Sequence, residues 1–179
     1  MRLFLDACVL FPVATREILR CYADAGGFTP LWSGRVMEEW ARAAGAKQNA
    51  EAAARGDIAL WRARFSGEIA GYEVLEAGID LPDPADIHVA AAAVHGQADA
   101  LLTFNIRDFP LREMRRLGVA RLHPDEYFAS RWRDDQGRLA EALSPLAQTA
   151  AAHGVGFRDF LKRASLPRLG KAWEGAARG

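Results

Sequence analysis

The sequence predicts an α/β fold with three layers, in which helices flank a central, mostly parallel sheet, followed by a helical C-terminal extension. Short apolar runs alternate with stretches of helical spacing along most of the chain. This alternation of strands and helices is typical of parallel sheets. After Pro124 the pattern is helical to the end and is interrupted only by glycines and prolines. We therefore expect one domain over residues 1–128 and a helical, basic extension over residues 129–179.

The first predicted strand is the apolar run Leu3 to Leu5, which ends directly at Asp6. Ser33 is a good N-cap, because its hydroxyl can accept a hydrogen bond from the first turn of a helix. The other elements expected in this half of the chain are a helix over 17–25, a strand over 28–32, a helix that follows Ser33 and runs through Val36, Trp40 and Ala43, a helix over 50–65 and a strand over 72–75.

The clearest boundary is Pro82-Asp83-Pro84, where Asp83 can cap a helix and Pro84 can occupy its first position. Apolar residues then recur on one helical face. The elements expected after this boundary are a helix that starts at Pro84 and carries Ile87, Ala90, Ala91 and Val94 on one face, a strand over 100–104, a helix over 111–117 and a strand over 119–122.

Charge and cysteine content exclude several classes of protein. Basic and acidic side chains number 23 each, so the whole-chain charge does not indicate a nucleic-acid partner. Residues 131–179 hold nine basic and five acidic side chains, so an extension with a net charge of +4 follows an acidic domain. Cys8 and Cys21 form no CxxC motif, which excludes a disulfide framework and the common zinc motifs. No apolar stretch is long enough to span a membrane, and we expect a cytoplasmic protein.

Three aspartates from distant parts of the sequence are predicted to meet at one edge of the sheet. Asp6 follows the first strand, Asp108 lies just beyond the strand that ends at Phe104, and Asp86 lies in the first turn of the preceding helix. Open parallel sheets carry their sites at the carboxyl ends of the strands. We therefore expect a cleft there, although Asp6 alone is also compatible with a turn and Asp86 with a helix-dipole role.

Helix geometry separates two neighbouring glutamates. The apolar face of the helix after Ser33 passes through Val36 and Trp40, and each residue turns the helix by about 100°. Glu39 falls beside this face, whereas Glu38 falls nearly opposite to it. We therefore expect Glu39 to point toward the cleft and Glu38 to point into solvent.

A cluster of carboxylates indicates a bound cation, because carboxylates in one cleft repel one another and would otherwise hold protons. Oxygen ligands without histidine or cysteine suit Mg²⁺ or Mn²⁺, which keep several waters and bridge to substrate phosphates. Such an ion lowers the pKa of a water that attacks phosphorus, and a second ion can stabilise the leaving oxygen.

Four blocks resemble PIN domains, and the resemblance covers residues 1–128. Each block is short, but the four occur in order with compatible gaps. They are Leu5-Asp6-Ala7-Cys8-Val9-Leu10, the helix from Ser33 through Glu39-Trp40, the segment from Pro84 to Ala93, and Leu102-Thr103-Phe104-Asn105-Ile106-Arg107-Asp108-Phe109.

The resemblance implies a nuclease whose catalytic and metal-binding acids are Asp6, Glu39, Asp86 and Asp108. The fourth role stays open, since Asp108, Asn105 or Asp83 can fill it, and Asp83 also has an ordinary explanation as a helix cap. Asn105 and Arg107 are expected to contact the substrate.

The resemblance to VapC-like toxins implies an endoribonuclease that forms a homodimer and is blocked by a cognate antitoxin protein. A housekeeping RNA-processing nuclease would share every site residue, and a non-catalytic RNA-binding or partner-docking module is the alternative from another class. A haloacid-dehalogenase-like phosphatase would need a second acid where Cys8 stands. The RNA substrate, the cut position and the identity of the antitoxin do not follow from the sequence.

Overall fold

The computed structural model describes residues 1–177, and these fall into two compact units. The first unit contains Met1–Phe11 and Thr29–Leu122, and the second contains Pro12–Phe28 and the chain from His123 onward. Helix α2 (Val13–Asp24) therefore groups with the C-terminal helices. The sequence-based boundary at residue 128 stays a prediction about independent domains.

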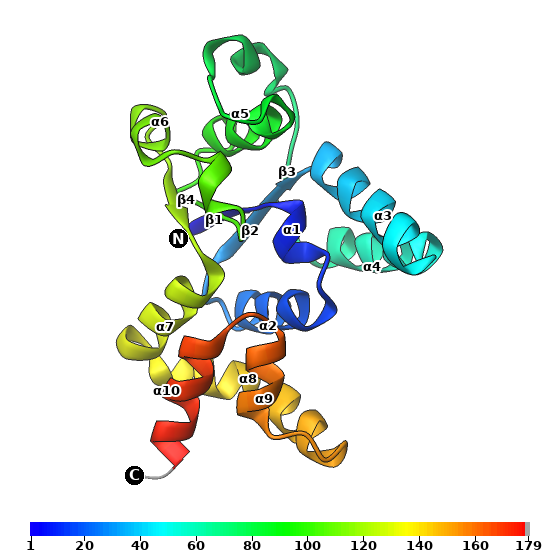
Figure 1. Ribbon diagram of the computed structural model, residues 1–179, viewed down its shortest axis with the longest axis vertical. Coiled ribbons are helices and arrows are strands. Elements are labelled where there is room, and N and C mark those ends of the chain that lie inside the picture. The colour runs from blue at the N-terminus through cyan, green and yellow to red at the C-terminus, as the bar shows by residue number, and fades with distance from the viewer. Residues whose placement is uncertain (178–179) are drawn as a thin grey trace. The chain divides into compact units, whose positions relative to one another are not determined.

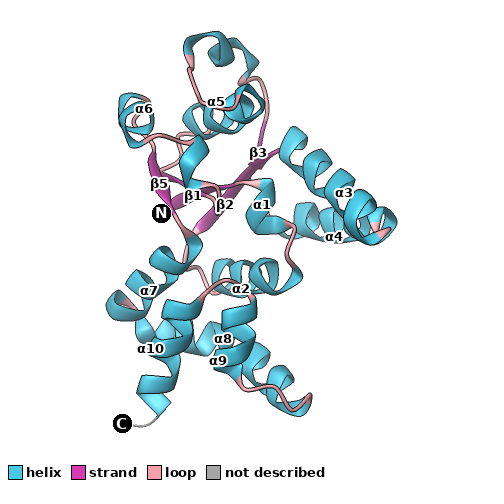
Figure 2. Cartoon of the chain, viewed as in Figure 1, coloured by secondary structure: helices cyan, strands magenta, loops and turns pink. Residues whose placement is uncertain are grey.

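The first unit is built on a five-stranded sheet with the order β3-β2-β1-β4-β5, drawn in magenta in Figure 2. Every neighbouring pair is parallel, which confirms the α/β prediction and makes the sheet fully parallel. The central strand β1 is apolar, and its residues from Leu3 to Leu5 are completely buried. The strands are β1 (Arg2–Leu5), β2 (Thr29–Ser33), β3 (Glu68–Ile69), β4 (Ala100–Leu102) and β5 (Ala120–Leu122).

Helices flank this sheet, and α3 and α4 lie side by side (Figure 1). Both predicted caps are confirmed. Ser33 Oγ accepts a hydrogen bond from Val36 N at 3.3 Å, and Asp83 Oδ1 accepts one from Ala85 N at 2.9 Å. The helices of this unit are α1 (Ala7–Leu10), α3 (Gly34–Gln48), α4 (Glu51–Arg64), α5 (Ile87–His95) and α6 (Leu111–Arg116), with 3₁₀ turns η1 (Glu73–Gly78), η2 (Pro84–Asp86) and η3 (Ile106–Asp108).

The predicted strand over 72–75 is wrong, because this segment enters the 3₁₀ turn η1. The edge strand β3 lies earlier, directly after Gly67. A Cβ atom on Gly67 would lie 1.9 Å from the carbonyl oxygen of Pro30, and Gly67 O accepts a hydrogen bond from Trp32 N at 3.1 Å. Only glycine allows this close approach to β2, so a backbone requirement and not an apolar alternation sets the position of β3.

The second unit is entirely helical in the residues that the structure describes. Aromatic rings from three segments form its core, with centroid distances of 5.9 Å between Tyr22 and Phe128 and 6.1 Å between Phe28 and Tyr127. No helix within residues 1–177 is long and apolar enough to cross a membrane. Besides α2, the helices are α7 (Pro124–Asp134), α8 (Gln136–Ala152), α9 (Phe157–Arg163) and α10 (Pro167–Ala177).

The buried carboxylate of Asp125 on α7 caps α10. It accepts hydrogen bonds from the backbone N–H groups of Arg168, at 2.9 and 3.1 Å, and of Leu169, at 3.2 Å. We expect Asp125→Ala to lower the free energy of unfolding by about 1–3 kcal/mol, because it leaves buried donors without a partner. The neighbouring Glu126 makes an exposed ion pair with Arg168, so Glu126→Ala should cost less than about 1 kcal/mol. Urea unfolding of both variants measures the difference, and equal losses would contradict the capping role.

Candidate metal-dependent active site

Asp6 stands at the carboxyl edge of the sheet, where the sequence places it. Strands β1 and β4 pair with Leu5 opposite Leu102, so Asp6 and Thr103 are the next residues along the two strands. Asp6 N donates a hydrogen bond to Leu102 O at 3.2 Å, and the Asp6 side chain is only 7% exposed. The parallel register therefore brings residues that are 97 positions apart in the sequence into contact.

Two neighbours hold the Asp6 carboxylate. The hydroxyl of Thr103 donates to Asp6 Oδ2 at 2.6 Å, and the thiol of Cys8 donates to the same oxygen at 3.1 Å. Thr103 Oγ1 also accepts a hydrogen bond from Asn105 N at 2.9 Å, and Cys8 Sγ accepts one from Phe104 N at 3.2 Å. The sheet edge, Asp6 and the loop that leads to η3 thus form one hydrogen-bonded network.

The thiol of Cys8 belongs to this network as a neutral donor. Burial raises the pKa of the Cys8 thiol to about 12, and the negative charge of Asp6 adds to the shift. A thiol of this kind is not a nucleophile at neutral pH. Its hydrogen bond helps to orient the Asp6 carboxylate.

Asp86 is the acid of this site that has a buried and unpartnered oxygen atom. It stands at the N-cap position of α5 and is half-buried, and its Oδ2 atom is buried without a hydrogen-bond partner within the described residues. Burial, together with the negative charges of Asp6, Asp83 and Asp108, raises the pKa of the Asp86 carboxyl to about 6. The shift shows that these acids are near enough to repel one another electrostatically.

Asp108 and Asp83 are the two acids near Asp86 that can fill the fourth acidic position. Asp108 ends η3 and is half-buried, whereas the Asp83 carboxylate already caps the turn before α5. Both charges act on Asp86. Asp108 has the more available carboxylate of the two, and its assignment as the fourth acid stays a prediction.

Glu39 lies against a buried histidine on α5. Its Oε1 atom is 2.8 Å from Nε2 of His88 and 3.6 Å from Nε of Arg35, and the side chain is 35% exposed. The imidazole of His88 is 1% exposed, and it is not aligned with Glu39 for a regular hydrogen bond. Glu39 is therefore held near the start of α5, beside a residue that lies two positions after Asp86.

Glu38 lies on a different face of α3 and is not free in solvent. Its carboxylate forms a bidentate ion pair with Arg55 of α4, at 3.0 and 3.2 Å. The Arg55 guanidinium lowers the pKa of Glu38 through these hydrogen bonds. The two glutamates thus have different partners, one on α4 and one on α5.

The two expected substrate contacts, Asn105 and Arg107, are exposed on the loop that carries Asp108. Arg121 holds the backbone of this loop in place. Its Nη1 atom donates hydrogen bonds to the carbonyl oxygens of Ile106 and of Phe109, the latter at 2.7 Å. Their assignment as substrate-binding residues stays a prediction.

The acidic residues of this site fit a hydrated divalent cation. Within residues 1–177, no three His, Cys, Asp or Glu side chains stand close enough together to hold a metal ion by themselves. Mg²⁺ does not need such a cage, because it keeps several waters and is often bound by one or two carboxylates with substrate phosphates. The unpartnered Asp86 Oδ2 among three further negative charges fits such an ion. Asp6, Asp86 and Asp108 are the residues that would hold it.

Sequence reasoning missed the roles of Thr103 and His88. Thr103 was detectable in principle, because it is the first residue after β4 and stands in register with Asp6. The contact between His88 and Glu39 depends on how α3 packs against α5, and no spacing within one helix reports it.

The pKa of Asp86 leads to a prediction on stability. The pKa of Asp86 is about 6 in the folded state, against an ordinary value of 3.8, so the folded state binds the proton more tightly than the unfolded state does. The free energy of unfolding of the metal-free protein should therefore fall as the pH rises from about 4 to about 6. Asp86→Asn should remove this part of the slope. Asp80→Asn is the control and should keep it. Melting temperatures in EDTA across this range measure both, and an unchanged slope in Asp86→Asn would refute the assignment.

Comparison with known proteins identifies the family of the chain. The model of the PIN domain family matches residues 2–107, which is more than half of the chain. This span contains Asp6, Glu39 and Asp86, and it ends one residue before Asp108. No curated protein and no solved structure shows significant similarity to the chain.

Proposed function

The chain belongs to the PIN domain family, whose members are generally metal-dependent nucleases, and from this premise we propose that it is a Mg²⁺- or Mn²⁺-dependent endoribonuclease. The observation that carries the proposal is Asp86, with its unpartnered buried oxygen and its raised pKa among Asp6, Asp83 and Asp108. An arrangement that destabilises a carboxylate is typical of a functional site and costs stability unless a ligand compensates the charge.

In this proposal the reaction is hydrolysis of a phosphodiester bond. A water oxygen forms a bond to phosphorus, the bond from phosphorus to the leaving oxygen breaks, and the proton of the water passes to solvent or to the leaving oxygen. A bound divalent cation supplies the positive charge that favours an attacking hydroxide and a negatively charged transition state.

The residues of the chain position and orient these groups. Thr103 and Cys8 fix Asp6 Oδ2 from one side, so the other oxygen of Asp6 is directed away from both. Asp86 contributes a desolvated oxygen and Asp108 a third carboxylate. His88 holds Glu39 beside the start of α5.

The test uses purified full-length protein and a labelled single-stranded RNA, with DNA of the same sequence in parallel. We expect internal cleavage of the RNA in Mg²⁺ or Mn²⁺ and none in EDTA, with recovery when the cation is restored. Cation-independent cleavage would overturn the proposed mechanism. RNA binding without cleavage would favour the non-catalytic binding module.

We further propose that the enzyme is the toxin of a toxin–antitoxin pair, and that it acts as a homodimer until an antitoxin protein covers the acidic site. The support is the resemblance of its four sequence blocks to VapC-like toxins. Induced expression of the wild-type chain should then arrest growth of a bacterial host, whereas Asp6→Asn should not. Growth at the uninduced rate during wild-type expression would favour the housekeeping nuclease. Light scattering of the purified chain tests the homodimer.

A further inference from the structure

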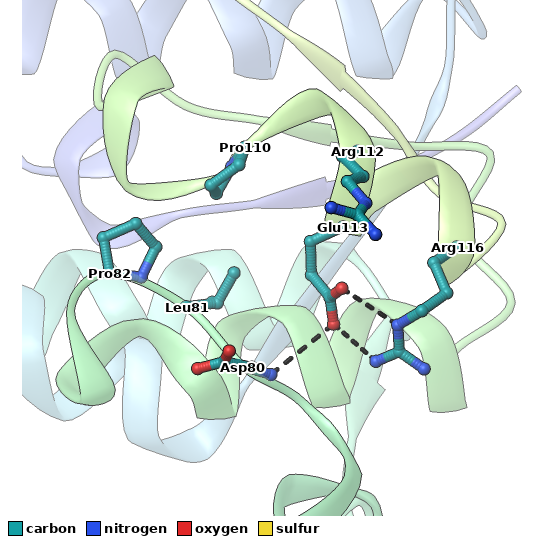
Figure 3. Close-up of a pocket in the computed structure, with 7 residues that line it drawn as sticks. All are labelled: Asp80, Leu81, Pro82, Pro110, Arg112, Glu113 and Arg116. Atoms are coloured by element: carbon teal, nitrogen blue, oxygen red, sulfur yellow. Dashed lines mark hydrogen bonds and ion pairs between the residues drawn. The ribbon is translucent and has the colours of Figure 1, made fainter.

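A pocket of about 790 Å³ lies within the first unit, on segments that directly adjoin the acidic residues. One wall, Asp80 to Pro82, ends one residue before Asp83. The other wall begins at Pro110, two residues after Asp108, and continues along α6. Figure 3 shows its lining side chains, which are Asp80, Leu81, Pro82, Pro110, Arg112, Glu113 and Arg116.

Hydrogen bonds tie the two walls together. Glu113 accepts a hydrogen bond from Asp80 N at 3.5 Å and another from Arg116 Nε at 2.9 Å (Figure 3). Arg116 Nη2 also donates to Gly78 O at 2.7 Å. These hydrogen bonds from Arg116 also lower the pKa of Glu113. Glu113 therefore neutralises the positive charge of Arg116. The same hydrogen bonds hold α6 against the segment from Gly78 to Asp80, which precedes Asp83.

Arg112 is the cation of this pocket that remains available. It is exposed on α6, and no hydrogen bond or ion pair joins it to another residue that the structure describes. A guanidinium presents a planar fork of N–H donors that matches a phosphate group. The pocket thus combines an unpaired phosphate-binding group with the apolar surfaces of Leu81, Pro82 and Pro110.

We propose that Arg112 binds a backbone phosphate of single-stranded RNA and that the pocket receives the nucleotide beside it. This inference rests on the proposed nuclease function. Arg112 lies four positions after Asp108, so their Cα atoms are at most about 14 Å apart. An RNA strand bound at the acidic residues can therefore reach Arg112. The strand must be unpaired, because only unstacked nucleotides can enter a pocket on the protein surface.

Arg115 provides a matched control. It lies on α6 as well, and its side chain is exposed and has no partner among the described residues, but it does not line the pocket. We expect Arg112→Gln to weaken binding of single-stranded RNA roughly tenfold and to reduce the slope of log Kd against log salt concentration by about one phosphate contact. Arg115→Gln should change affinity by less than about twofold. Fluorescence anisotropy of labelled RNA, with the full-length chain in EDTA, measures both.

A second arm identifies the phosphate. A series of RNA analogues is used, each with one uncharged methylphosphonate linkage at a different position in the strand. At one position, the substitution should lower the affinity of the wild-type protein for RNA but not the affinity of Arg112→Gln. Such non-additivity indicates direct contact between the guanidinium and that phosphate. Additive losses at every position, or equal effects of the Arg112 and Arg115 variants, would overturn the proposal. A wild-type chain that does not bind RNA would overturn it as well.

The binding assay and the cleavage assay fail separately. If the chain cleaves RNA but Arg112 behaves like Arg115, the pocket assignment is wrong and the nuclease function stands. If Arg112 passes the binding test but no cation restores cleavage, the nuclease proposal is wrong and the RNA contact stands. If Arg112→Gln weakens binding equally at every methylphosphonate position, Arg112 contacts no particular phosphate and the RNA assignment is refuted.

Discussion

Asp6→Asn should abolish cation-dependent RNA cleavage, with a loss of at least about 100-fold in kcat/KM. The substitution removes a ligand charge at the sheet edge, and even groups that only orient a metal ligand typically contribute 10- to 100-fold. Initial rates on a labelled RNA at saturating Mg²⁺ measure the loss. Cleavage within a few-fold of the wild type would remove Asp6 from the site.

The same variant separates a functional aspartate from a structural one. An asparagine oxygen can still accept the hydrogen bond of the Thr103 hydroxyl, which lies 2.6 Å from Asp6 Oδ2, while the repulsion between Asp6 and Asp86 disappears. The melting temperature in EDTA should therefore stay level or rise. A fall of many degrees would show instead that Asp6 is required for the fold.

Glu39→Gln should reduce kcat by roughly tenfold or more, whereas Glu38→Gln should stay within about twofold of the wild type. The two residues are neighbours with identical chemistry, but Glu39 lies at His88 near the acidic residues and Glu38 lies at Arg55 of α4. The exposed pair with Arg55 contributes little to stability. Steady-state rates with full Mg²⁺ titrations compare the two variants. Equal losses, or a larger loss for Glu38→Gln, would refute the role of the helix face.

Local sequence signals predicted most of the first unit. Capping residues gave the starts of α3 and of the turn before α5, because a cap acts within three residues of its helix. Apolar runs gave β1 and β4. The edge strand β3 was missed because it has only two residues, and its position depends on the approach of Gly67 to Pro30. The grouping of α2 with the C-terminal helices was missed because it depends on ring contacts such as that between Tyr22 and Phe128.

The sequence predicted the acids of the candidate site but not the side chains that contact them. Strand ends indicate which acids approach one another, and the proximity of Asp6, Asp86 and Asp108 in the structure agrees with that reasoning. The partners of these acids do not follow from strand ends. Thr103 and His88 act through side chains that meet across separate elements, at 2.6 and 2.8 Å from Asp6 and Glu39. Contacts of this kind depend on tertiary packing, which one sequence does not report.

The most direct test of the central claim is anomalous X-ray diffraction from crystals grown with Mn²⁺ at a pH above the pKa of Asp86, which is about 6. The account predicts an anomalous peak at coordination distance from the carboxylates of Asp6 and Asp86, with Asp108 directly bound or joined through a water. The peak should vanish in Asp86→Asn crystals. A wild-type map without a peak at these residues, or with Asp86 Oδ2 hydrogen-bonded to a protein donor, would contradict a cation site at this edge of the sheet.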